Sequence, residues 1–251
     1  MHFHKIQPFS CYNLSMNVFA SIGIVVLAML IMASLQLVPG VFALFHHYSL
    51  GKYSFQKTSR LSLFFILGTE IISAFLFIAS FFIASILFLN DLDPRNNIVT
   101  WIFVGIFASL TIVSFFFYFR HPHSKDTILF LPRRYASALN QRANNVKKPT
   151  DAFTLGALSN IYELVFTLPL YIITATEIMY MHTEYFADDL LTILYILISA
   201  IPLLNMYLSF LLGHNLADIE RSRIKDKTFH RFSISLGYIT IMILMIFFRI
   251  A

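Results

Sequence analysis

The chain alternates between long apolar blocks and short polar segments. A helix rises 1.5 Å per residue, so about 20 apolar residues are needed to cross the hydrocarbon core of a bilayer. Six blocks are near or above this length, and the pattern predicts an all-α membrane protein with six transmembrane helices. The predicted spans are residues 16–46, 61–89, 99–119, 152–180, 188–212 and 232–250.

The composition and the position of the charges support this pattern. Hydrophobic residues make up 58% of the chain and charged residues 12%, whereas about a quarter of a soluble domain is charged. Fifteen of the 18 lysines and arginines lie in three alternate connecting segments. By the positive-inside rule these segments are cytoplasmic and both termini lie outside the cell. The prediction is therefore a multi-pass protein of the plasma membrane, with the lipid bilayer as a partner and no nucleic acid.

The chain divides into two halves of three spans each. Residues 1–119 form the first predicted repeat, residues 120–150 a basic cytoplasmic linker, and residues 151–251 the second repeat. A shift of 127 residues places Gln36 on Glu163 and superimposes the apolar blocks. Because each half has an odd number of spans, the halves must be inverted, and the expected plan is a 3+3 inverted repeat with both termini outside.

The linker is predicted to contain a short amphipathic helix. Residues 128–143, ILFLPRRYASALNQRA, could form this helix at the inner headgroup layer, where the basic residues meet anionic lipid as the expected partner. Docking of another protein on this linker is the alternative.

The fourth span carries a polar stripe. At about 100° per residue, its polar side chains fall within roughly a third of the helix circumference. The stripe consists of Gly156, Ser159, Asn160, Glu163, Thr167, Thr174 and Glu177. A carboxylate inside a membrane often marks the path of an ion or a proton. The alternative is a protonated Glu163 that joins helices by a hydrogen bond.

A second carboxylate, Glu70, lies in the second span. No lysine or arginine lies within the apolar cores to pair with either acid, so the two favour a cation or a proton over an anionic substrate. The predicted substrate or ion site combines Glu163 and Glu70 with Gln36, Asn160, Asn205 and Thr167. Helix breaks are predicted at Pro39, Gly40 and Pro169, because proline removes a backbone donor.

Other chemistry is restricted. The single cysteine, Cys11, excludes an intramolecular disulfide. Six histidines fall on the predicted cytoplasmic side and leave metal binding open: His46, His47, His121, His123, His214 and His230. No hydrolase, phosphate-loop or zinc-protease motif is present, so neither an enzyme nor a cofactor is expected.

Two short motifs resemble those of LysE/RhtB-type exporters. Gly156 and Asn160 precede the apolar run that begins at Leu164, and Pro39-Gly40 is similar to the Pro-Gly element of that family. The resemblance implies a 3+3 membrane fold. The family's Asn-Pro-Lys is absent, and so is the cysteine pair of the related CcdA/DsbD-type proteins, which excludes thiol relay.

The sequence therefore predicts a secondary transporter that exports a small cationic or zwitterionic solute or a metal ion. Coupling to protons or to the membrane potential would pass through the intramembrane carboxylates. The alternative is a non-transporting membrane scaffold or accessory subunit. Whether the chain forms a homo-oligomer is left open.

Overall fold

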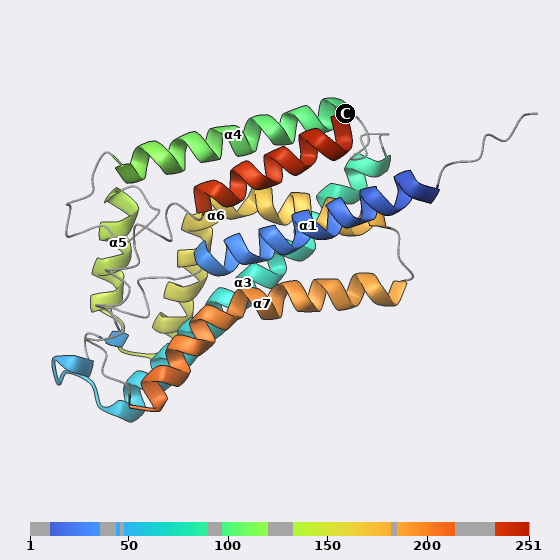
Figure 1. The fold of residues 1–251 in the computed structure, drawn as a ribbon. Helices are drawn as coiled ribbons and strands as arrows, with labels where there is room; N and C mark the ends of the chain where they lie inside the picture. Colours follow the sequence, from blue (N-terminus) through green and yellow to red (C-terminus); the bar gives the residue numbers. More distant parts are fainter. Residues whose placement is uncertain are drawn as a thin grey trace, which may run out of the picture.

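The protein is all-helical in the part of the chain that its computed structural model describes, residues 11–35, 44–45, 48–89, 97–119, 133–181, 185–213 and 234–250. Five long helices and a C-terminal helix run along one bundle, and a short helix lies across one end (Figure 1). The helices are α1 (Cys11–Leu35), α3 (Phe55–Leu89), α4 (Asn97–Phe119), α5 (Arg133–Asn144), α6 (Pro149–Met181), α7 (Tyr185–Leu211) and the C-terminal helix (residues 234–250), which ends in a π-helical turn at Ile246–Ile250.

Local capping explains where the helices begin and end. The Ser54 hydroxyl accepts the Lys57 N–H at 3.3 Å, which caps the start of α3. At the start of α6, Asp151 accepts the Lys148 N–H at 2.9 Å and follows a proline at the first helical position. Two residues after α7 ends at Leu211, Gly213 adopts a φ of 74°, a left-handed conformation common just after a helix.

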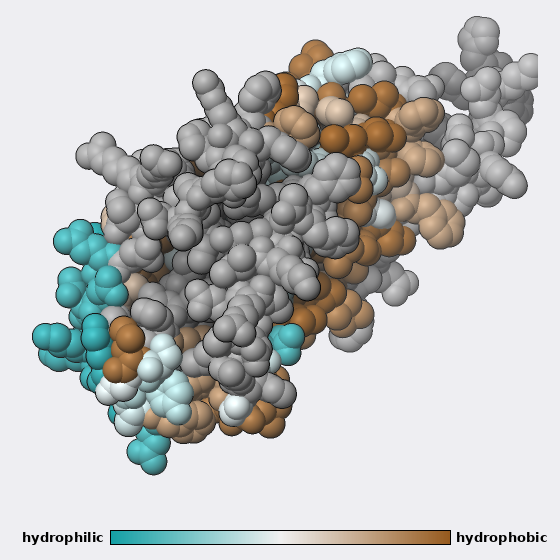
Figure 2. Space-filling model, turned by 60° about the vertical axis from the view of Figure 1, so that its left-hand side comes forward, coloured by the Kyte–Doolittle hydropathy of each residue, from teal (hydrophilic) through white to brown (hydrophobic). Residues whose placement is uncertain are grey.

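Among the described residues, four helices are long and apolar enough to cross a membrane: α3, α4, α6 and α7. Two shorter apolar helices, Phe19–Leu35 and Ile234–Phe248, accompany them. Many large apolar side chains of these helices are exposed, and hydrophilic side chains gather at one end of the face in Figure 2. Exposed apolar area of this extent is typical of a lipid-facing surface. The described helices therefore confirm a helical protein suited to a membrane.

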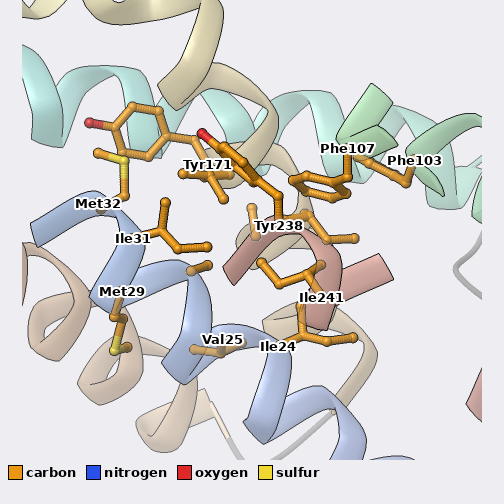
Figure 3. Close-up of a cluster of buried hydrophobic side chains, with 14 of the residues drawn as sticks. Ile24, Val25, Met29, Ile31, Met32, Phe103, Phe107, Tyr171, Tyr238 and Ile241 are labelled. Atoms are coloured by element: carbon orange, nitrogen blue, oxygen red, sulfur yellow. The ribbon is translucent and has the colours of Figure 1, made fainter. Parts of the chain in front are cut away.

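The helices enclose two hydrophobic cores. The first joins α1, α3, α4, α6, α7 and the C-terminal helix, and Met32, Phe107 and Tyr238 are among its side chains (Figure 3). Phe107 and Tyr238 stack with their ring centroids 5.8 Å apart. The second core lies nearer the hydrophilic end, between the starts of α3 and α6, the end of α7, and α5. The two cores hold α3, α6 and α7 together along most of their length.

The cross-lying helix α5 packs on the protein. The sequence predicts that an amphipathic helix of the linker lies on the headgroup layer. Leu139 and Ala143 are buried in the second core, and Arg142 is exposed. The apolar side of α5 is thus covered by the bundle.

Helices α6 and α7 both change direction along their course (Figure 1). Each contains an internal proline, Pro169 in α6 and Pro202 in α7. A proline inside a helix removes one backbone hydrogen bond and is a common cause of a bend.

Candidate functional site: a polar cluster between α3 and α6

The polar stripe of α6 faces the interior of the bundle. Its members are buried to 4% exposure or less, Glu163 being the most exposed of the side chains at 4%. On the opposite side of the helix, Ile161 and Val165 are 47% and 72% exposed. The rotational position predicted from the sequence is therefore confirmed.

Two glycines bring α3 and α6 into close contact. A Cβ atom added to Gly156 would lie 2.1 Å from the Phe65 carbonyl oxygen, and one added to Gly68 would lie 2.2 Å from the Phe153 carbonyl oxygen. Only hydrogen atoms fit between the two backbones at these points. Small residues allow such contacts between membrane helices, and here the contact is reciprocal.

This close crossing aligns the polar groups of the two helices. Just beyond it, the Asn160 amide donates a hydrogen bond to the Thr69 carbonyl oxygen at 3.0 Å. The bond is buried, and Asn160 is 2% exposed. Asn160 therefore fixes the position of α6 against the turn of α3 that carries Glu70.

A tyrosine hydroxyl lies at the centre of the cluster. Tyr171 of α6 is fully buried, and its hydroxyl lies 2.6 Å from the Ser73 hydroxyl of α3, where either oxygen can donate. The carboxyl groups of Glu70 on α3 and Glu163 on α6 lie near enough to interact electrostatically with this hydroxyl. Carboxyl groups from two helices thus lie in the neighbourhood of one buried hydroxyl. We call Glu70, Ser73, Asn160, Glu163 and Tyr171 the carboxyl cluster.

Among the described residues, Glu70 has no hydrogen-bond partner for its carboxyl group. Both of its carboxyl oxygens are buried. An ionised carboxylate buried in this way costs several kcal/mol. The arrangement therefore suits a carboxyl group that holds a proton or faces a bound cation.

Of the carboxyl cluster, the predicted site omits Ser73 and, on α6 itself, Tyr171. It lies eleven residues after Asn160, which corresponds to a rotation of only about 20° around the helix. The same periodicity that assembles the stripe therefore includes it. It is omitted because tyrosine is equally common on the lipid-facing side of a membrane helix.

A second polar contact joins α6 to α1. The Ser21 hydroxyl donates to a Glu177 carboxyl oxygen at 2.7 Å, and both residues are fully buried. A position near the end of the span would allow contact with water, but α1 covers this end of α6 and Glu177 is buried.

The other predicted site residues are distributed unevenly. Thr167 is buried in the stripe, and its hydroxyl donates to the Glu163 carbonyl oxygen of its own helix at 3.3 Å. Asn205 is exposed on α7, so it does not belong to the buried cluster. Pro169 lies within α6. Gln36, Pro39 and Gly40 lie outside the described residues.

The described residues contain no cluster of side chains that could bind a metal ion. No group of three or more histidine, cysteine, aspartate or glutamate side chains is placed there to hold an ion. All six histidines that the sequence places on the cytoplasmic side lie outside these residues.

Comparison with known proteins gives no match to a protein-family model, to a curated protein or to a solved structure.

Proposed function

We propose that the protein is a secondary transporter in which Glu70 and Glu163 carry the transported or coupling charge. Its substrate would be a small cationic or zwitterionic solute or a metal ion, exported in exchange for protons or driven by the membrane potential. One observation carries the proposal: Glu163 is buried in the bundle, and both carboxyl oxygens of Glu70 on the neighbouring helix are buried without a hydrogen-bond partner among the described residues.

The chemistry of the cluster favours a positive ligand. Two acids near each other in a low-dielectric site repel when both are ionised, so a shared proton or a cation stabilises the pair. Ser73, Asn160 and Tyr171 add neutral oxygen atoms that can solvate a cation. If one carboxyl group loses its proton when a cation enters, the movement of the cation is coupled to the movement of the proton.

The membrane arrangement is part of the proposal. It has six spans in the plasma membrane, both termini outside and the two halves related as inverted repeats. The exposed basic residues Lys52, Lys57, Arg60 and Arg142 lie around the start of α3 and the end of α5, which favours this end of the bundle as the cytoplasmic one. The resemblance to LysE/RhtB-type exporters agrees with the plan.

The transport test uses proteoliposomes that contain a pH-sensitive dye. Lysine, arginine, putrescine, Mn²⁺ and Zn²⁺ are supplied separately, and the protein-dependent proton movement is recorded together with solute uptake. We expect one of these solutes to move with wild-type protein. Flux should fall at least about tenfold in Glu70→Gln combined with Glu163→Gln, since a transition-state loss of about 1.4 kcal/mol already gives that factor.

Glu177→Gln is the matched control. Glu177 is also a buried carboxyl group on α6, but it lies outside the carboxyl cluster and accepts a hydrogen bond from Ser21. Its glutamine variant should retain most of the flux. Transport of the solute at the wild-type rate in the Glu70→Gln, Glu163→Gln double variant would refute the proposed role of the carboxyl groups.

A scaffold is the competing function, and the close glycine crossing of α3 and α6 favours it, because a fixed pair of helices suits a structural subunit. Accessibility distinguishes the two without a known substrate. In a Cys11→Ser background, a transporter must expose Ser159→Cys or Thr167→Cys to water in one of its states. Val165→Cys, on the lipid-facing side, is the control. If neither stripe position reacts with a water-soluble thiol reagent, the scaffold is favoured.

A further inference from the structure

A pocket of about 330 Å³ lies at the hydrophilic end of the bundle, between the start of α3 and the segment that precedes α6. This volume lies at the lower end of the range of small-ligand sites, roughly 300 to 1,000 Å³. Its lining consists of Ser54, Gln56, Lys57, Arg60, Leu61, Lys147 and Pro149. The pocket is remote from the carboxyl cluster, since thirteen residues of α3 between Lys57 and Glu70 span about 20 Å.

The pocket is positively charged. Three basic side chains, those of Lys57, Arg60 and Lys147, line it, and no acidic side chain belongs to this lining. The nearby carboxylate of Asp151 is already engaged, because it accepts the backbone N–H groups of Lys147 at 3.2 Å and Lys148 at 2.9 Å. The three cations are therefore available to an anion from outside.

Neutral donors complete the lining. The first turn of α3 begins at this pocket. The Ser54 hydroxyl accepts the Lys57 N–H, and the remaining N–H groups of the turn have no partner within the helix. They carry a partial positive charge that favours an anion. Ser54 and Gln56 add side-chain donors. A phosphate group can use this set fully, since it accepts several hydrogen bonds and pairs in a bidentate way with arginine.

The pocket is preformed. The Tyr53 hydroxyl donates to the Val146 carbonyl oxygen, which ties the segment before α3 to the segment before α6. The Lys57 ammonium lies 4.2 Å from the centre of the Tyr53 ring, so the same tyrosine positions one of the cations. Leu61 and Val146 are buried and support the two walls.

The position of the pocket matches that of a lipid headgroup. Phe55, at the first position of α3, is 41% exposed, and Leu50 is 55% exposed. Apolar side chains thus lie beside the three cations, at the boundary between the hydrophilic end and the apolar surface. We propose that this pocket binds a phosphate group, either of an anionic phospholipid or of a soluble phosphate ester. The proposal does not depend on transport.

The test measures binding through the thermal midpoint of the full-length protein in a nonionic detergent. Phosphatidylglycerol and glycerol 1-phosphate are titrated separately. We expect saturable stabilisation of the wild type. The pocket variant, Lys57→Gln with Arg60→Gln and Lys147→Gln, should raise the apparent Kd at least about tenfold, because three charge-assisted contacts are lost.

The control variant removes the same charges outside the pocket. Lys52→Gln with Arg142→Gln and Lys148→Gln also loses two lysines and one arginine at the same end, and its Kd should change less than about threefold. If the triple variants lose their helical circular dichroism, Arg60→Gln and Arg142→Gln replace them.

The possible outcomes distinguish a lipid headgroup, a soluble phosphate ester and the absence of a specific site. A shift with phosphatidylglycerol alone supports a lipid headgroup, and a shift with glycerol 1-phosphate supports a soluble ligand. Equal losses in the pocket and control variants would overturn the site, because the effect would then be general surface charge. The absence of saturable stabilisation of the wild type by either compound would overturn it as well.

Discussion

Gly156→Ala should separate the two central helices of the bundle. The added methyl group would lie 2.1 Å from the Phe65 carbonyl oxygen and 3.0 Å from the Thr69 nitrogen. Both are backbone atoms, which no side-chain rotation can move. The helices α3 and α6 must therefore part by about 1 Å to restore ordinary contact distances.

The contacts at the crossing determine how much free energy of unfolding Gly156→Ala should lose. Overpacking at a close contact costs about 1 to 3 kcal/mol. A separation of about 1 Å also lengthens the 3.0 Å bond from Asn160 to the Thr69 carbonyl beyond hydrogen-bonding range, and such a bond between membrane helices contributes about 1 kcal/mol. The higher helix propensity of alanine returns up to about 1 kcal/mol. The net destabilisation should be about 2 kcal/mol.

Unfolding in mixed micelles titrated with SDS, followed by circular dichroism, measures this difference. Gly105→Ala is the matched control, since it is the same substitution within α4 and a Cβ there meets nothing within 4 Å. It should leave the free energy of unfolding unchanged or raise it by up to about 1 kcal/mol.

The reciprocal geometry gives a second test. Gly68→Ala should cost as much as Gly156→Ala, but the double variant should cost less than the sum, because the first methyl group already opens the space for the second. The reasoning would be refuted if Gly156→Ala were as stable as Gly105→Ala, or if the two substitutions at the crossing were additive.

Two further substitutions test the remaining polar contacts by the same unfolding measurement. Tyr53→Phe removes the donor to the Val146 carbonyl and should cost about 1 kcal/mol, while Tyr48→Phe should cost less. Burial raises the pKa of the Tyr53 hydroxyl above its ordinary 10.0. The difference in free energy of unfolding between the wild type and Tyr53→Phe should therefore be largest below pH 10, and it should disappear as the pH rises through the folded-state pKa. Ser21→Ala removes a donor to buried Glu177 and should cost about 1 to 3 kcal/mol, whereas Ser109→Ala, whose hydroxyl is exposed and bonds within its own helix, should change stability by less than about 0.5 kcal/mol. Equal losses in either pair would contradict the assigned contacts.

The apolar pattern predicts four of the long helices closely, but it misplaces their starts. The block predicted at residues 61–89 belongs to a helix that begins at Phe55. The additional turns are polar, so hydropathy does not register them, although Ser54 is a recognisable cap. The inverted repeat and the six-span topology stay predictions, since one of the two predicted breaks lies outside the described residues.

The sequence predicts where the polar residues of the candidate site lie around a single helix, but it does not predict which residues of two helices meet. Periodicity gives the angular position of Glu163 on α6, because that depends on local geometry alone. The meeting of Gly68 with Gly156 depends on which two helices cross and at what height. A single glycine in an apolar helix carries no such information. For the same reason, the contacts of Ser21 with Glu177 and of Ser73 with Tyr171 could not be predicted.

The inward-facing stripe of α6 also bears on how the protein enters the membrane during synthesis. Of the four longest apolar helices, α6 has the lowest mean hydropathy, 1.5 against 2.0 to 2.3, and each charged residue near a span's centre opposes insertion by about 2.5 to 3.5 kcal/mol. Its bonds to Ser21, Thr69 and Ser73 lead to α1 and α3, which leave the ribosome earlier. Partners for its polar groups are therefore in place when α6 emerges. A circular permutation that placed α6 ahead of α3 would bring Asn160 and Glu163 into lipid without them.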